Sequence, residues 1–233
     1  FNGPVGNDPA LLTHNEVTTL FHEFGHGLHH MLTQVETLGV SGINGVPWDA
    51  VELPSQFMEN WCWQSEGLAL ISSHYQSGEA LPVALLDKLL AAKNFQSGMQ
   101  MLRQLEFGLF DLYIHRNWEI VTYEQVQRVL NQVREQFSVV PTVDYNRFQN
   151  SFSHIFAGGY AAGYYSYKWA EVLSADAFAR FEEEGIFNPQ TGKDFLHHIL
   201  ERGGSAEPTA LFEAFRGREP NTDALLRHSG LIG

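Results

Sequence analysis

The segment LFHEFGHGLHH, residues 20–30, places four histidines and one glutamate within nine positions. Apolar side chains recur around it at the three- and four-residue spacing of an amphipathic helix. They are Val17, Leu20, Phe21, Phe24, Leu28 and Met31. Thr13, followed three residues later by Glu16, has the pattern of a capping box that opens a helix. The sequence therefore predicts a helix over residues 14–34 that carries the histidines.

His22 and His26 are four residues apart, so both imidazoles project from one face of this helix and can share one tetrahedral ion. Glu23 lies beside them, which completes the HExxH pattern of zinc peptidases, with the glutamate placed as a general base. The pattern fixes three positions only, so it also occurs by chance. Gly25 and Gly27 each cost a helix interior roughly 1 kcal/mol. Their presence indicates that another part of the chain approaches this backbone closely.

A catalytic zinc needs a third protein ligand and an open fourth position. One class of HExxH peptidases continues with a glycine three residues and a histidine six residues after the second histidine. His29 and Leu32 stand at these positions, so that class is excluded. His29 and His30 are interpreted as packing or surface residues.

Glu52 and Glu59 are the downstream candidates, seven residues apart and therefore two turns apart on a helix predicted over 50–74. This pairing suits one zinc ligand and one carboxylate that accepts the free ring N–H of a ligating histidine. Alternatively, Asp49 and Glu52 form a capping box at the start of that helix. The spacing leaves both interpretations open.

The rest of the chain is predicted to be mainly α-helical, with at most a small β-hairpin in the glycine-rich segment 39–48. The remaining long helices are expected at 82–115, broken near Gly98 or Gly108, at 122–137, and from about 160 to Gly185. Together they predict one domain over residues 1–233.

The composition limits the kinds of partner that the protein is expected to bind. The 233 residues carry a net charge of −13, which argues against nucleic acid and anionic membranes as partners. There is no apolar run long enough to predict a membrane span. The single cysteine, Cys62 in WCW, cannot form an internal disulfide, so a reducing, cytoplasmic location and a buried structural thiol are expected.

HEFGH followed by VELPSQFMENW (residues 51–61) resembles the thimet oligopeptidase (M3) family of zinc metallopeptidases, especially its bacterial members. The resemblance extends over essentially the whole chain. It implies one Zn²⁺ per chain, with Glu52 as third ligand beside His22 and His26, and a zinc-bound water activated by Glu23. Glu59 falls on the acidic residue of ENW, where we expect it to orient a ligating histidine.

A second motif, SHIFAGGYAAGYYSYKW (residues 153–169), carries tyrosines at 160, 164 and 167. On a helix that begins near 160 they would share one face, either as an aromatic packing stripe or as hydrogen-bond donors to the oxyanion of peptide hydrolysis. The glycine pair 158–159 would make a mobile loop that closes on a substrate. The resemblance implies that His154, Tyr160 and Tyr167 contact the substrate and stabilise the tetrahedral intermediate, with Tyr164 as a further contact.

The sequence thus predicts a zinc-dependent endopeptidase that cleaves short oligopeptides. A dipeptidyl carboxypeptidase of the same family and a non-catalytic zinc- or peptide-binding domain are the alternatives. The resemblance implies a multi-helical, zincin-type catalytic domain that is the C-terminal portion of a longer two-domain enzyme. The missing N-terminal domain would form the other wall of the substrate channel, so the isolated chain is expected to have weak or no activity.

Overall fold

The computed structural model describes residues 1–117 and 119–232, and it is mainly α-helical, as predicted. Within these ranges the only β-pairing is two isolated bridges, Val5–Asp8 and Ser73–Ala80. The helices in chain order are α1 (His14–Met31), α2 (Trp48–Val51), α3 (Leu53–Glu59), α4 (Ser65–Ile71), α5 (Val83–Lys93), α6 (Ser97–Arg116), α7 (Tyr123–Phe137), α8 (Ser153–Phe156), α9 (Tyr165–Glu184), α10 (Pro189–His198), α11 (Pro208–Arg216) and α12 (Asp223–His228). Short 3₁₀ helices cover Leu38–Val40, Asn60–Trp63, Phe148–Asn150 and Leu200–Arg202.

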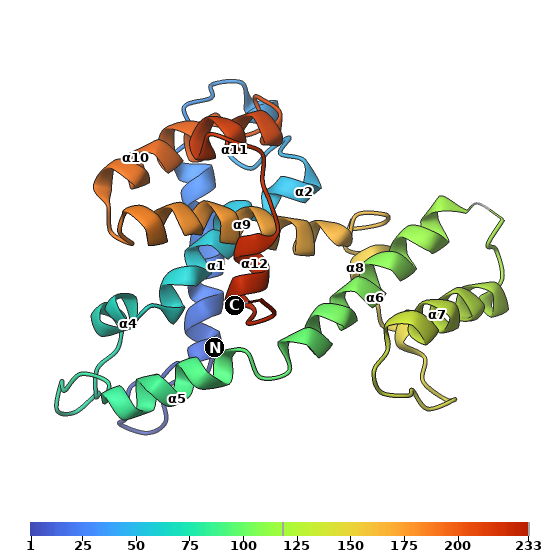
Figure 1. The fold of residues 1–233 in the computed structure, drawn as a ribbon, viewed down its shortest axis with the longest axis horizontal. Coiled ribbons are helices and arrows are strands. Elements are labelled where there is room, and N and C mark those ends of the chain that lie inside the picture. Colours follow the sequence, from blue (N-terminus) through green and yellow to red (C-terminus); the bar gives the residue numbers. More distant parts are fainter. Residues whose placement is uncertain (118, 233) are drawn as a thin grey trace.

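The main body is built around α9, with α1 and α3 behind it, α10 and α11 on one side and α12 on the other (Figure 1). Its core is a cluster of buried aromatic and aliphatic side chains. Phe57 on α3 stacks on Phe195 of α10 at 4.0 Å between ring centroids. The other buried members are Leu53, Leu173, Ala177, Phe178, Phe181, Ile199, Leu200, Phe212 and Phe215.

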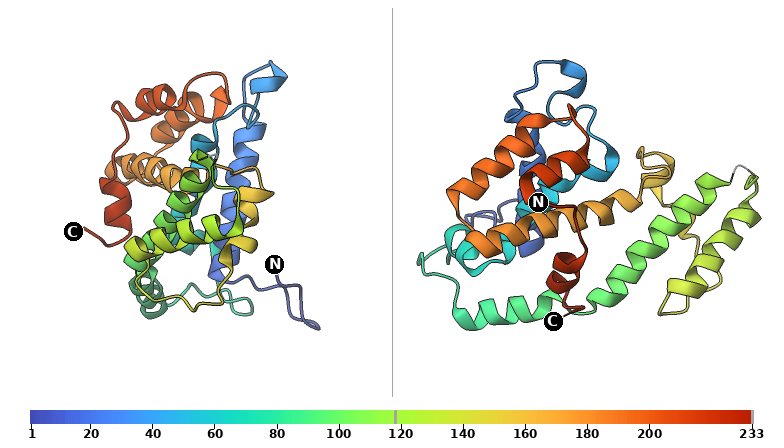
Figure 2. Two further views of the ribbon diagram at one scale, coloured as in Figure 1. Left: turned by 90° about the vertical axis from the view of Figure 1, so that its right-hand side faces the viewer. Right: turned by 45° about the horizontal axis from the view of Figure 1, so that its top comes forward.

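A second unit, the α6–α8 arm, extends from this body (Figures 1 and 2). The arm has its own small core, formed by Phe110, Leu130, Phe152, Ile155 and Tyr164. Tyr164 immediately precedes α9, so the arm meets the main body within the tyrosine-rich motif.

Two helix predictions differ from the structure in the first half of the chain. The first helix ends at Met31, three residues before the expected 34. The helix expected over 50–74 is broken into short segments, because Pro54 has no N–H to continue the pattern and Gln64 is extended. Asp49 lies inside α2, where Pro47 is the N-cap, so its interpretation as an N-cap was wrong.

The later predictions are partly confirmed. The helix expected at 122–137 is present as α7. The one expected at 82–115 breaks at residues 94–96, close to Gly98 as one of the two predicted positions, because Gln96 has a left-handed φ of 56°. The helix expected from 160 begins only at Tyr165. Within the described residues, every helix is too short or too polar to form a membrane span.

Candidate metal centre and active site

The site depends on a close approach between α1 and α3. A Cβ atom added at Gly25 would lie 2.5 Å from the Pro54 carbonyl oxygen and 2.5 Å from the Cα of Ser55. Real atoms do not approach so closely, so only glycine allows this contact. Gly27 is different, because its nearest neighbour would be the end of the Met31 side chain at 3.8 Å. The expectation of a close backbone approach is therefore confirmed for Gly25 and wrong for Gly27.

This contact brings three ligand-type side chains together, which we call the metal triad: His22, His26 and Glu52. The Oε2 atom of Glu52 lies 3.3 Å from Nε2 of His22 and 3.2 Å from Nε2 of His26. Within the described residues, this is the one group of three or more such side chains that could hold an ion. Ligands at typical zinc bond lengths in a tetrahedron are separated by roughly 3.3 Å. The donor types, and the separation of each histidine nitrogen from the Glu52 oxygen, therefore fit a zinc ion.

Neighbouring groups fix two members of the triad. Oε1 of Glu59 lies 2.6 Å from Nδ1 of His22, which leaves Nε2 of that histidine directed at Glu52. The Ser55 hydroxyl donates to Oε2 of Glu52 and the Tyr160 hydroxyl donates to its Oε1, each at 3.0 Å. Such partners fix the orientation of a ligand and commonly raise metal affinity.

The charges of the triad are strongly coupled. Burial disfavours the charged form of His22, but hydrogen bonds to Glu52 and Glu59 outweigh it and raise its pKa to about 10. Burial acts to raise the pKa of Glu52, yet its bonds to His22, His26 and Tyr160 hold this pKa well below the usual range. A metal ion at these atoms would take the place of the proton that the pair otherwise holds.

Glu23 follows His22 on α1 and faces an open cleft. Its side chain is exposed and borders a cleft of about 450 Å³, together with His22 and Glu59. Asn15, Thr18 and Thr19 of α1 form the rest of the lining. A water molecule and a peptide can therefore reach Glu23 from this side.

Tyr160 and Tyr167 come together as predicted but for a different reason. Their rings stack at 4.7 Å between centroids, although Tyr160 lies in a loop before α9 rather than on the helix. The shared helix face predicted for the tyrosines was therefore wrong. Trp48 of α2 supports the other side of Tyr160 at 4.5 Å. Burial, with Tyr167 and Glu52 nearby, raises the pKa of Tyr160 well above its usual value, so its hydroxyl keeps its proton.

His154 and Tyr164 flank this pair. The exposed His154 ring lies 6.4 Å from the Tyr160 ring and 6.1 Å from the Tyr167 ring, between centroids. Tyr164 is buried in the core of the arm, and its hydroxyl donates to Oε1 of Gln104 at 3.1 Å. Burial raises the pKa of Tyr164 to about 12. The geometry thus favours the packing interpretation for Tyr164.

Three residues that position the site escaped the sequence reasoning. Ser55 holds Glu52, and Gln56 donates from Nε2 to the backbone oxygen of Tyr167 at 3.2 Å. Both directly follow the VELP segment, and this adjacency was the available signal. Trp48, the third, carries no comparable signal, because only the tertiary fold places it against Tyr160.

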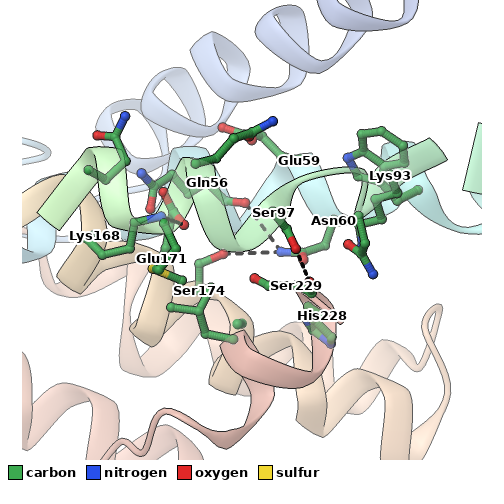
Figure 3. Close-up of a pocket in the computed structure, with 17 residues that line it drawn as sticks. Gln56, Glu59, Asn60, Lys93, Ser97, Lys168, Glu171, Ser174, His228 and Ser229 are labelled. Atoms are coloured by element: carbon green, nitrogen blue, oxygen red, sulfur yellow. Dashed lines mark hydrogen bonds and ion pairs between the residues drawn. The ribbon is translucent and has the colours of Figure 1, made fainter. Parts of the chain in front are cut away.

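A polar cavity of about 500 Å³ lies between α3, α9, α12 and the α5–α6 junction (Figure 3). Glu59 borders both this cavity and the cleft in front of Glu23. Lys168 and Glu171 form an ion pair on its wall, and burial raises the pKa of Glu171. Asn60 donates to the Ser174 hydroxyl at 3.2 Å. These polar groups of the lining thus have partners, whereas the buried Oε1 of Gln56 in the same lining accepts no hydrogen bond from the described residues.

Two histidines and a glutamate placed to hold one ion, with a second glutamate at an open cleft, are the arrangement expected of a metallopeptidase. Comparison of the sequence with known protein families assigns the chain to a narrower class. Residues 1–231 match the sequence profile of Peptidase family M3, so the chain belongs to this family.

The chain is 66% identical to Oligopeptidase A of Haemophilus influenzae over 232 residues, which cover 100% of the chain and 34% of that relative. It is 37% identical to Saccharolysin of Saccharomyces cerevisiae, over 99% of the chain and 32% of the relative. Dipeptidyl carboxypeptidase of Escherichia coli is 36% identical, over 99% of the chain and 34% of the relative. The chain therefore spans about a third of the length of the curated relatives it matches.

Proposed function

We propose that this chain is the catalytic domain of a zinc-dependent endopeptidase that hydrolyses short oligopeptides. The convergence of the metal triad beside the exposed Glu23 carries this proposal. The higher identity to Oligopeptidase A than to Dipeptidyl carboxypeptidase supports an endopeptidase rather than an exopeptidase.

His22, His26 and Glu52 would hold one zinc ion, which when bound supplies a Lewis acid that polarises the scissile carbonyl and acidifies water. Glu23 accepts a proton from the attacking water and delivers it to the leaving amine. Glu59 keeps Nδ1 of His22 engaged, so that Nε2 of this histidine is available as a ligand atom.

The tyrosines act on the opposite side of the scissile bond. Tyr167, with the protonated Tyr160 stacked on it, donates a hydrogen bond to the oxyanion that develops in the transition state. His154 is exposed beside this pair and contacts the substrate backbone. Tyr164 would contact the substrate only by releasing Gln104, to which its hydroxyl now donates.

A preceding domain would form the other wall of a channel that admits short peptides, and without it the isolated chain would have weak or no activity. The cytoplasmic location expected from the single cysteine also stays a prediction.

The function is tested by Glu23→Gln in the full-length protein. General-base catalysis contributes roughly 10²- to 10⁴-fold, so this variant should bind zinc normally and lose at least about 100-fold in kcat. Glu36→Gln, the same change at an exposed glutamate after α1, is the matched control and should keep full activity. Near-normal peptide cleavage by Glu23→Gln would refute the proposed base.

Cleavage of two peptide substrates, one with a free C-terminus and one amidated there, distinguishes the three candidate functions. An endopeptidase cleaves a peptide and its C-terminally amidated form at the same internal bonds, whereas a dipeptidyl carboxypeptidase needs the free carboxylate. A non-catalytic binding domain would leave both peptides intact while binding zinc. The presence of Glu23 beside the two histidines favours catalysis, because binding alone does not need a base.

A further inference from the structure

Asp111 on α6 is a fully buried aspartate, with 0% of its surface exposed. Its carboxylate contacts none of the metal triad. Instead, Oδ1 accepts a hydrogen bond from the backbone N–H of Ala162, and Oδ2 accepts one from the N–H of Tyr164, both at 2.9 Å. Nδ1 of His115, one turn along α6, lies 2.7 Å from Oδ1. The buried carboxylate is thus satisfied mainly by a segment far along the chain.

That segment is residues 157–164, here called the tyrosine loop, which joins α8 to α9. Within it, Tyr160 N–H donates to the His154 oxygen at 3.0 Å and Gly163 N–H donates to the Tyr160 oxygen at 2.8 Å. Ala162 has a left-handed φ of 56°, which is unfavourable for a residue with a Cβ atom. Because the N–H of this strained residue is held by Asp111, the loop conformation depends on a contact from another helix.

The tyrosine loop carries Tyr160 to the metal triad. The Tyr160 hydroxyl reaches Oε1 of Glu52, and its ring lies between Trp48 and Tyr167. The loop thus links the arm, through Asp111, to a candidate zinc ligand.

We propose that Asp111 is a positioning residue that holds the tyrosine loop, so that Tyr160 stays in place against Glu52 and Tyr167. The anchoring can be measured without any enzyme activity. Its catalytic consequence rests on the proposed function.

The chain offers a matched control in Asp176 of α9, which is also 0% exposed. Its carboxylate is bonded by Arg216, by Arg218 and by the N–H of Asn221, and it touches no residue of the tyrosine loop. Asp176→Asn therefore removes a buried, hydrogen-bonded carboxylate without acting on the loop. A general loss of stability would appear in both variants, whereas a loss of anchoring appears only in Asp111→Asn.

The first experiment needs no variant. In hydrogen exchange of the full-length wild-type protein, the Ala162 and Tyr164 amides should exchange at least about tenfold more slowly than the Ala161 amide in the same loop. Equal rates at these three amides would overturn the anchoring, even if Asp111→Asn fails to fold.

The second experiment compares the variants. Asp111→Asn puts an amide N–H₂ against a loop N–H, so exchange across 157–164 should rise at least about tenfold while α1 is unaffected. Asp176→Asn should leave exchange in this loop as it is in the wild type. A uniform rise in all helices for Asp111→Asn, or no rise in the loop, would contradict the proposal.

The third experiment measures kinetics and zinc content of the same proteins. Asp111→Asn should lower kcat at least about tenfold, change KM less than about threefold and keep one zinc per chain, while Asp176→Asn keeps kcat within about twofold. Equal losses of kcat in the two variants would overturn the positioning role. An inactive wild-type protein would count against the proposed function alone, since the exchange results would still decide the anchoring.

Discussion

The α1–α3 pair holds the metal half of the site by backbone contact, whereas the arm holds the tyrosine half by hydrogen bonds to a loop. In the first half, Gly25 lies directly against Pro54 and Ser55, so the triad has little freedom. In the second half, the position of Tyr160 depends on the Asp111 carboxylate of α6, which accepts hydrogen bonds from the tyrosine loop. The ligand set is thus held by backbone packing, whereas the tyrosines are held through a loop and touch the triad only at the Tyr160–Glu52 hydrogen bond.

The largest expected effect comes from breaking the rigid half. Gly25→Ala would put a methyl group into the backbone of α3, and overpacking with no room to relax should cost about 3 kcal/mol of unfolding free energy. The two helices would separate and zinc affinity would fall sharply. Gly27→Ala is the control, because its added methyl group would make only an ordinary contact with the end of the Met31 side chain and should stabilise the helix by about 1 kcal/mol. Denaturant unfolding and zinc titration measure both, and similar results for the two variants would refute the close-contact account.

The next largest effect is expected from a variant in the tyrosine half of the site. Tyr167→Phe removes one hydrogen-bond donor to the oxyanion, which typically costs roughly 10²- to 10³-fold in kcat, and it should leave zinc content and stability unchanged. Tyr165→Phe, a change at the exposed neighbour, is the control. Steady-state kinetics on a short peptide provide the measurement. A raised KM with an unchanged kcat would make Tyr167 a binding residue only.

A smaller effect is expected from Glu59→Gln. The amide oxygen can still accept from Nδ1–H of His22, but the charge that strengthens this contact is lost. Removing such an outer partner typically costs roughly 10- to 100-fold in metal affinity, and we expect the lower end. Competition with a fluorescent chelator measures the affinity, with Glu36→Gln as control. An unchanged zinc affinity would show that Glu59 does not support the ligand.

A smaller effect again is expected in the proton that His22 releases when zinc binds. Because the pKa of His22 is raised to about 10, this ring is protonated at neutral pH in the metal-free protein. Zinc binding should then release about one proton from His22, and zinc affinity should fall about tenfold per pH unit as the pH is lowered below 10. Calorimetry in buffers of different ionisation enthalpy counts the proton. Binding at pH 7 without proton release would contradict this charge state.

The unfolding free energy of the metal-free protein should fall as the pH rises, whereas its zinc affinity should rise. A histidine whose pKa rises on folding stabilises the metal-free fold fully below its unfolded pKa of about 6.5, and this contribution disappears as the pH rises towards 10. Metal-free protein should therefore become less stable from pH 6.5 to 10, and His22→Gln should reduce that loss. Thermal unfolding at several pH values compares the two proteins.

Much of the metal half was readable from the sequence, because the spacing of His22 and His26 depends only on helix geometry. The proximity of Glu52 and Glu59 to His22 was also expected, although the helix that was to carry them is interrupted at Glu52, just before Pro54. Their spacing of seven survives the interruption, since Glu52 is the N-cap of α3, Glu59 is its last residue, and α3 packs against α1.

The tyrosine half was less accessible. Periodicity placed Tyr160 on a helix, but Ala162 turns left-handed and α9 starts only at Tyr165. What stabilises that turn is Asp111, some fifty residues earlier, and local patterns carry no information about such a contact. Tyr160 and Tyr167 were therefore paired correctly for the wrong structural reason.

The central claim is that His22, His26 and Glu52 together bind one zinc ion. An anomalous difference map, recorded at the zinc edge from crystals of the zinc-loaded protein, tests it most directly. We predict a single peak within bonding distance of Nε2 of His22, Nε2 of His26 and the Glu52 carboxylate. A zinc peak on other residues, or no peak at these three in a fully loaded crystal, would contradict the account.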